Sequence, residues 1–114
     1  MIAVVSAHED PPPREVQYRV DIAPEDQGGE YANFLAVWHS PHEFTLDFCG
    51  LQPGQPADPE DETSPFVLPC RVVSRVRIPV SVVFDVLRAL NENMTRYEDT
   101  FGPIKRIEPK SQGH

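Results

Sequence analysis

The chain has 114 residues, of which 39% are hydrophobic, 25% are charged and 13 are proline. This length and mixture suit one globular domain with a single hydrophobic core. The formal net charge of −8 argues against a phosphate-binding surface, which needs clustered lysine and arginine, and against binding to anionic membranes. No apolar run approaches the roughly 20 residues of a membrane span, and the first residues lack the basic start of a signal peptide. We therefore expect a cytoplasmic protein that binds neither nucleic acid nor membrane.

Both ends of the chain are predicted to be flexible tails. Residues 1–15, which include three consecutive prolines, and residues 105–114 have too few apolar side chains to offset the entropy lost on ordering. Residues 16–104 form the predicted domain. Within it, residues 52–66 are rich in proline and acidic side chains and are predicted to be a solvated loop.

The first two predicted strands differ in the number of their apolar faces. Residues 16–22 alternate between apolar and polar side chains, which indicates a strand that is buried on one face. Residues 31–39 are apolar on both faces. One face carries Ala32, Phe34, Ala36 and Trp38, and the other is dominated by Tyr31, Leu35 and Val37. A strand of this kind needs cover on both sides.

The next two predicted strands carry opposite charges. A turn at Ser40-Pro41-His42 leads into a strand in which Phe44, Leu46 and Phe48 alternate with polar and acidic residues. Residues 70–78 also alternate, but here apolar residues face basic ones on the opposite side of the strand. The acidic side chains are Glu43 and Asp47, and the basic ones are Arg71, Arg75 and Arg77. Cross-strand ion pairs are the expected arrangement. The alternative is that these charges form the acid and base groups of a small enzyme.

An amphipathic helix is predicted after Pro79. Its apolar stripe recurs at steps of three and four and consists of Val83, Val86, Leu87, Leu90, Met94, Tyr97 and Phe101. On the far side, Asp85, Arg88, Glu92, Arg96 and Asp99 follow one another at spacings that allow ion pairs. Gly102 and Pro103 should end the helix. The predicted fold is thus α+β: a four-stranded antiparallel meander followed by one long C-terminal helix that packs on the sheet.

This arrangement leaves apolar sheet surface without cover. Four strands span roughly 19 Å, whereas one helix with its side chains covers only about 10 to 12 Å. A symmetric homo-oligomer is the commonest way to bury the remainder. We therefore expect a dimer or tetramer that also binds another protein, with an interface formed by Tyr31, Phe34, Leu35, Val37, Trp38 and Phe44. The alternative is that the tails fold back over this surface.

The sequence contains no motif that predicts catalysis, a cofactor or a metal. It has no nucleophile elbow, no phosphate-binding glycine loop and no zinc-ligand spacing. His39 and His42 flank a turn without a third ligand of suitable type, so no metal site is expected there. Cys49 and Cys70 lack a CxxC spacing and are predicted to be buried, reduced thiols, although a contact between them stays open.

Several segments occur together in the order typical of a known family. They are Tyr31-Ala-Asn-Phe, His39-Ser-Pro-His-Glu-Phe, Leu46-Asp-Phe, Arg75-Val-Arg, Asn91-Glu-Asn-Met-Thr-Arg-Tyr-Glu and Phe101-Gly. On these segments the chain resembles, from Tyr31 to Ile104, a small prokaryotic family known as domain of unknown function 3467 (DUF3467). The insert between Gln52 and Pro69 is longer than in that pattern, and Pro79 stands where a serine cap is expected. The resemblance implies no activity.

The predicted architecture is also similar to that of SecB-type export chaperones. Those proteins are acidic cytosolic oligomers in which four antiparallel strands precede a long helix, and they hold unfolded chains on exposed apolar grooves. The similarity is one of architecture without a shared motif, and it implies a non-enzymatic protein-binding module or chaperone.

Overall fold

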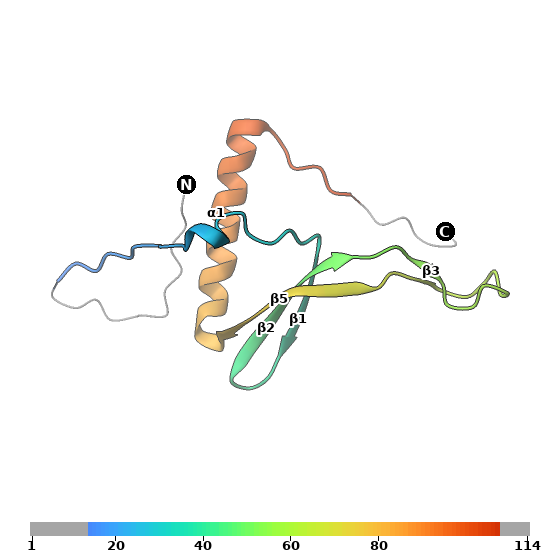
Figure 1. Ribbon diagram of the computed structural model, residues 1–114. Coiled ribbons are helices and arrows are strands. Elements are labelled where there is room, and N and C mark those ends of the chain that lie inside the picture. Colours follow the sequence, from blue (N-terminus) through green and yellow to red (C-terminus); the bar gives the residue numbers. More distant parts are fainter. Residues whose placement is uncertain (1–13, 108–114) are drawn as a thin grey trace. The chain divides into compact units, whose positions relative to one another are not determined.

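The computed structural model describes residues 14–107 of the chain. Its elements are η1 (Pro24–Asp26), β1 (Phe34–His39), β2 (Glu43–Leu51), β3 (Gln55–Pro56), β4 (Phe66–Val67), β5 (Cys70–Pro79), η2 (Val80–Val82) and α1 (Val83–Phe101), as Figure 1 shows. The fold is α+β, with antiparallel strands and one C-terminal helix. The predicted tails, 1–15 and 105–114, lie mostly outside the described residues.

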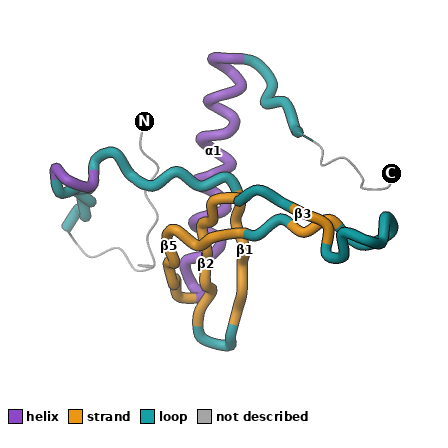
Figure 2. Tube along the Cα trace, turned by 45° about the vertical axis from the view of Figure 1, so that its right-hand side comes forward, coloured by secondary structure: helices purple, strands orange, loops and turns teal. Residues whose placement is uncertain are grey.

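The main sheet has three strands, in the order β1-β2-β5, and not the four that were predicted. The missing strand is the first one, because residues 15–22 have no regular secondary structure and are drawn as loop in Figure 2. Alternation of apolar and polar residues defines a strand's two faces, but it does not provide a hydrogen-bonding partner. The other three predicted strands are confirmed, although β1 begins at Phe34 and not at Tyr31.

The described chain divides into two compact units. The helical unit contains the chain up to Gly29, His39–Phe44 and Arg77–Ile104. The strand unit contains Glu30–Trp38, Thr45–Val76 and the chain from Lys105 onward. Each unit is described below by itself.

In the helical unit, the predicted helix consists of the η2 turn followed by the 19 residues of α1. No side chain caps its start, since Val82 occupies the cap position. Its end is closed twice by Glu98. The Gly102 amide donates to the Glu98 carbonyl oxygen over 2.9 Å, and the Ile104 amide donates to a Glu98 carboxylate oxygen over 2.9 Å. Gly102 has a φ of 94°, which only glycine adopts readily, so its role as the stop is confirmed.

The outer side of α1 makes fewer ion pairs than its spacing predicts. Asp85 and Arg88 pair at 2.8 Å, but within the described chain none of the later predicted pairs comes within 4.0 Å. Along the apolar stripe, Tyr97 and Phe101 place their ring centroids 4.9 Å apart. No residue of α1 is buried, and the packing of the helix on the sheet stays a prediction.

The β1–β2 turn confirms the prediction at Ser40-Pro41-His42. The Ser40 amide donates to the Glu43 carbonyl oxygen over 2.9 Å. The Ser40 hydroxyl oxygen accepts from the amides of His42 and Glu43, at 3.2 and 3.3 Å. Because the serine side chain satisfies two amides inside the turn, the turn holds its shape without a glycine.

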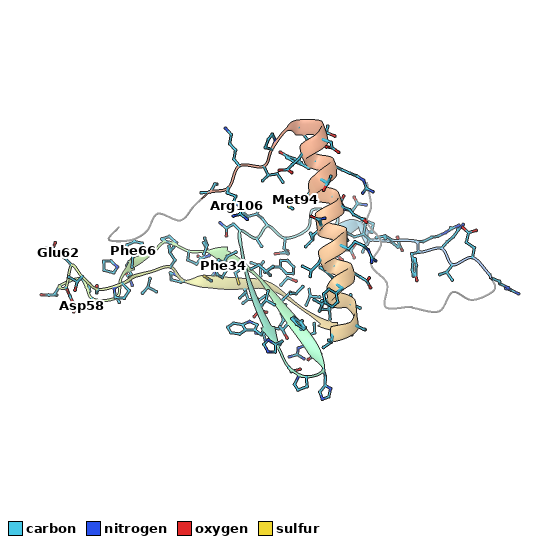
Figure 3. The ribbon with its side chains drawn as sticks, turned by 180° about the vertical axis from the view of Figure 1, so that it is seen from behind. Phe34, Asp58, Glu62, Phe66, Met94 and Arg106 are labelled. Carbon is cyan, nitrogen blue, oxygen red and sulfur yellow. The ribbon has the colours of Figure 1, made fainter. Side chains whose placement is uncertain are left out.

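In the strand unit, residues 57–65 of the acidic segment predicted as a solvated loop are turns and bends without helix or strand, and two short strands, β3 and β4, pair at the base of this loop to form a hairpin. Gln55 pairs with Val67 and Pro56 with Phe66. Figure 3 shows Asp58 and Glu62 at the tip of this hairpin and Phe66 farther from the tip. The turn forms because serine and aspartate side chains satisfy backbone groups, a feature that composition does not reveal. The Asp58 backbone N–H donates to Ser64 Oγ over 3.1 Å. Ser64 Oγ in turn donates to the Asp58 carbonyl oxygen over 2.9 Å.

Candidate functional site

Three side chains on three neighbouring strands form the best-defined polar cluster of the strand unit. Trp38 Nε1 of β1 donates to Asp47 Oδ2 of β2 over 2.9 Å. Arg75 of β5 holds the same carboxylate with two hydrogen bonds, Nε to Oδ1 at 2.7 Å and Nη2 to Oδ2 at 2.9 Å. The predicted cross-strand pairing of the acidic and basic strands is thereby confirmed.

The burial of this cluster is uneven. Asp47 is only 3% exposed, whereas Trp38 is 58% exposed and the Arg75 side chain 54%. A buried carboxylate is tolerated because a bidentate guanidinium and an indole N–H replace its water shell. The hydrogen bonds and charge of Asp47 raise the pKa of Arg75. The cluster therefore presents a tryptophan ring and an arginine at the surface, both held from beneath by one aspartate.

These contacts assign each side chain of the sheet to a face. Trp38, Asp47 and Arg75 are hydrogen-bonded to one another and so lie on one side, which we call the charged face. Since strand side chains alternate, their sequence neighbours point to the other side. We call that side the apolar face, and within the strand unit it carries Leu35, Val37, Leu46, Phe48, Val72 and Val76, with Ser74 between the two valines.

The apolar face is largely open to solvent. Leu35 is 47% exposed, Val37 51%, Val72 46% and Val76 41%. The β2 residues between them, Leu46 and Phe48, are only half-buried. Six side chains of this face are aliphatic or aromatic, yet none of the six is buried, so the face lacks the cover that a folded domain normally gives such residues.

Four of the six predicted interface residues lie in β1, where they are divided between the two faces of the sheet. Leu35 and Val37 lie on the apolar face, whereas Phe34 and Trp38 alternate with them and share the charged face. Tyr31 precedes β1 and is 82% exposed. Phe44, at the start of β2, is half-buried, and its ring centroid lies 5.8 Å from that of His39.

The remaining charges of the predicted enzyme constellation are loosely arranged. Arg77 Nε lies 3.7 Å from Glu43 Oε1, and both side chains are substantially exposed. Within residues 14–107, no carboxylate comes within ion-pairing distance of Arg71. The Asp47 carboxylate is fully engaged by Arg75 and Trp38. These contacts are those of structural ion pairs on a sheet face.

The two cysteines behave differently from each other. Both are free thiols; Cys49 is buried, as predicted, but Cys70 is exposed, which corrects the prediction for that residue. Burial raises the pKa of Cys49, and the nearby Cys70 and Asp47 raise it further. Cys70 stands at the first position of β5, and within residues 14–107 no strand lies on the outer side of β5.

His39 and His42, where no metal site was expected, and the acidic hairpin hold no cluster of metal ligands among the described residues. His39 ends β1 and His42 lies in the exposed turn, and among residues 14–107 no three potential metal ligands come together. The acidic hairpin has an open pocket of about 720 Å³, lined mainly by Pro56, Pro59, Asp61, Glu62, Pro65 and Phe66. Asp61 Oδ1 accepts from the Thr63 hydroxyl at 2.6 Å, and this bond lowers the pKa of Asp61.

Asn33 is a structural residue that the sequence does not reveal. The Asn33 backbone N–H donates to the Cys49 carbonyl oxygen over 3.0 Å, and the Asn33 side-chain oxygen accepts from the Leu51 backbone N–H over 2.9 Å. These two bonds extend the β1–β2 pairing beyond Phe34. An asparagine before a strand has many uses, so no sequence signal marks this one.

The fold and this pair of faces define a small antiparallel-sheet protein with a C-terminal helix. Comparison with known families adds its lineage: the model of a family described as "Protein of unknown function (DUF3467)" matches residues 5–106. The chain belongs to this family, and the match extends farther toward the N-terminus than the segments that first suggested it. No curated protein and no solved structure matches the chain. In the described part, no helix has the length and apolar character to cross a membrane.

Proposed function

We propose that this chain is a self-associating, non-enzymatic protein-binding module whose copies meet through the apolar face. The observation that carries the proposal is the exposure of that face, where Leu35, Val37, Val72 and Val76 are each more than 40% exposed. A second copy of the chain is the occupant that such a surface fits best, because it brings an identical apolar face.

The energetic gain from covering this face is considerable. Full burial of one large aliphatic side chain is worth about 1.5 to 3 kcal/mol. For the four exposed side chains, which are already about half covered, completing the burial contributes roughly 3 to 6 kcal/mol per copy. That gain is comparable with the net stability of a small domain, about 5 to 15 kcal/mol. A single copy in water forgoes this stabilisation.

The charged face supports the second half of the proposal, the binding of another protein. Tryptophan and arginine are the residues most enriched at the energetic centres of interfaces. Here Trp38 is held by its bond to Asp47 before any partner arrives, so its ring loses little conformational freedom on binding. Arg75 and Arg71 lie on the same face. A protein segment that offers a carboxylate beside an apolar side chain has the matching chemistry.

Light scattering coupled to size exclusion tests the self-association. We expect the wild-type chain to be a dimer or tetramer at micromolar concentration. Val37→Glu places a charge on the apolar face and should shift the chain toward monomer. Val67→Glu is the matched control, because Val67 in β4 is 46% exposed, close to the 51% of Val37, but lies in the acidic hairpin. A wild-type chain that is strictly monomeric contradicts the proposal.

The likeness to SecB-type chaperones that the sequence predicts gives the binding half a direct assay. Wild-type protein, added in excess to a chemically unfolded client that aggregates on dilution, should suppress the light scattering of that client. Trp38→Ala should reduce the suppression more than Val67→Ala. Unchanged client aggregation at all ratios would argue against chaperone activity and leave an adaptor for a folded partner, which native co-purification with Trp38→Ala as control would identify.

A further inference from the structure

Residues 15–22 have the pattern of a strand but form none within the single chain. Their side chains alternate as Glu15, Gln17, Arg19 and Asp21 on one side and Val16, Tyr18, Val20 and Ile22 on the other. The segment is nevertheless loop, and Val16, Val20 and Ile22 are 45%, 76% and 54% exposed. It belongs to the family's domain, since the family match begins at residue 5. A half-apolar strand of this length needs a sheet edge.

The main sheet offers such an edge at β5. This strand is terminal in the order β1-β2-β5, and it runs for ten residues, from Cys70 to Pro79. Within the described residues no strand pairs with its outer side. A terminal strand presents a row of backbone donors and acceptors that an added strand can satisfy.

One antiparallel register matches every side chain of the segment with a suitable neighbour on β5. It sets Glu15 opposite Arg77, and each later residue of the segment faces the preceding residue of β5, so that Ile22 faces Cys70. On the charged face the opposed pairs are Glu15 with Arg77, Gln17 with Arg75, Arg19 with Val73, and Asp21 with Arg71. On the apolar face they are Val16 with Val76, Tyr18 with Ser74, Val20 with Val72, and Ile22 with Cys70. Two ion pairs and two valine pairs are formed, and no like charges are opposed.

The competing arrangements fit less well. In the parallel alignment that places Glu15 opposite Arg71, Arg19 is opposed to Arg75, and like charges directly opposite are destabilising. The other edge of the sheet, β1, has only six residues and carries neither a carboxylate nor an arginine. The antiparallel alignment on β5 also gives Arg71 an ion-pairing partner, which it lacks within residues 14–107 of a single copy.

We propose that residues 15–22 of one copy add to the outer edge of β5 of a second copy as an antiparallel strand, with Ile22 opposite Cys70. The inference rests on the proposed self-association and adds to the contact through the apolar face a second contact, at the strand edge. The second copy provides the edge because, among residues 14–107 of one chain, the segment forms no strand and no strand lies on the outer side of β5. The added strand widens the apolar face by Val16, Tyr18, Val20 and Ile22.

A disulfide between copies tests the register directly. Directly opposed residues of an antiparallel pair have Cα atoms about 4.5 to 5.5 Å apart, within the range that a disulfide spans. One copy carries Ile22→Cys together with Cys70→Ser, and a second copy, enlarged by a tag, keeps Cys70. Mild oxidation of the mixture should give a cross-linked species of mixed mass on a non-reducing gel. Asp21→Cys in place of Ile22→Cys is the control, because its side chain lies on the other face and should cross-link far less.

The same samples separate the two proposals. A mixed-mass cross-link that depends on Ile22→Cys supports the strand addition. If light scattering shows a dimer but Ile22→Cys cross-links no better than Asp21→Cys, the strand addition is wrong and the self-association stands. If Ile22→Cys in a chain that keeps its own Cys70 forms only an internal disulfide, the pairing lies within one copy and the inference is overturned. A monomeric wild-type chain overturns both.

Charge reversal provides a second measurement that does not depend on cysteine chemistry. Asp21→Arg should weaken self-association at least about five-fold, as expected for losing a cross-strand ion pair and creating a like-charge one. Arg71→Asp alone should weaken it similarly, and the two substitutions together should restore the wild-type affinity. Independent, additive losses in the double variant would contradict the opposition of Asp21 and Arg71.

Discussion

The two faces of the main sheet solve the problem of burial in different ways. On the charged face, Asp47 is 3% exposed because Arg75 and Trp38, from the two neighbouring strands, enclose it. On the apolar face, none of the corresponding side chains is buried. Hydrogen bonds and ion pairs need only a few well-placed partners, which three strands can supply, whereas apolar burial needs area. The comparison shows that polar contacts from two neighbouring strands bury the aspartate of the charged face, whereas the same three strands leave the side chains of the apolar face exposed.

The largest effect should come from breaking the charged face. Asp47→Ala leaves Arg75 and the Trp38 N–H without their acceptor, and we expect the free energy of unfolding to fall by about 2 to 3 kcal/mol. Chemical denaturation followed by tryptophan fluorescence measures the change. Thr45→Ala, two residues away on the same face, is the control and should cost less. An Asp47→Ala variant as stable as wild type would mean that the cluster does not support the sheet.

Two adjacent valines of β5 test the difference between the faces with the same substitution. Val72 lies on the apolar face and Val73 on the charged face, and they are 46% and 37% exposed. Val72→Thr introduces a hydroxyl into the proposed contact between copies and should weaken self-association by about 1 to 2 kcal/mol. Val73→Thr should leave the association constant nearly unchanged. Sedimentation equilibrium compares the two, and equal effects would remove the distinction between the faces.

A smaller loss is expected from Trp38→Phe, which keeps an aromatic ring but removes the N–H donor to Asp47. The free energy of unfolding should fall by about 1 kcal/mol, the typical net value of one hydrogen bond. Partner or client binding should weaken as well, because the ring is no longer held in place. If binding weakens while stability is unchanged, the bond to Asp47 orients the ring without supporting the fold.

The cysteines should differ in reactivity without any change in stability. Cys70 is exposed, whereas Cys49 is buried and its pKa is raised above the ordinary 9.0, so less thiolate is present at a given pH. Iodoacetamide at pH 8 should modify Cys70 first, as followed by peptide mass spectrometry. Modification of Cys49 should begin only at higher pH or on unfolding. Equal rates at both sites would show that the face around Cys49 is open.

Much of the fold was predictable from residue patterns. The period of two in residues 43–48 and 70–78 and the helical stripe after Pro79 correspond to β2, β5 and α1. Residues 16–22 show the same period of two but form no strand, because alternation says nothing about the partner. The β3–β4 hairpin was missed because it is built by Ser64 and Asp58 side chains that bond the backbone, a feature that composition hides.

The candidate site was predictable in part. The opposition of acidic and basic strands follows from their alternation, and the Asp47–Arg75 pair confirms it. The role of Trp38 does not follow, because an indole on a strand reads as an apolar residue and its N–H partner depends on the register of β1 against β2. For the same reason, the six predicted interface residues were grouped by their apolar character, although the four of them in β1 lie on two sides of the sheet.

Asn33 lies outside the strands, yet it contributes to the register of β1 against β2. Its hydrogen bonds to the Cys49 carbonyl oxygen and the Leu51 amide join the chain just before β1 to the end of β2. A slip of a single residue would turn every side chain of β1 over, so that Trp38 would leave the aspartate and Val37 would take its place. Asn33 thus helps to fix the register that places Val37 on the apolar face and Trp38 on the charged face.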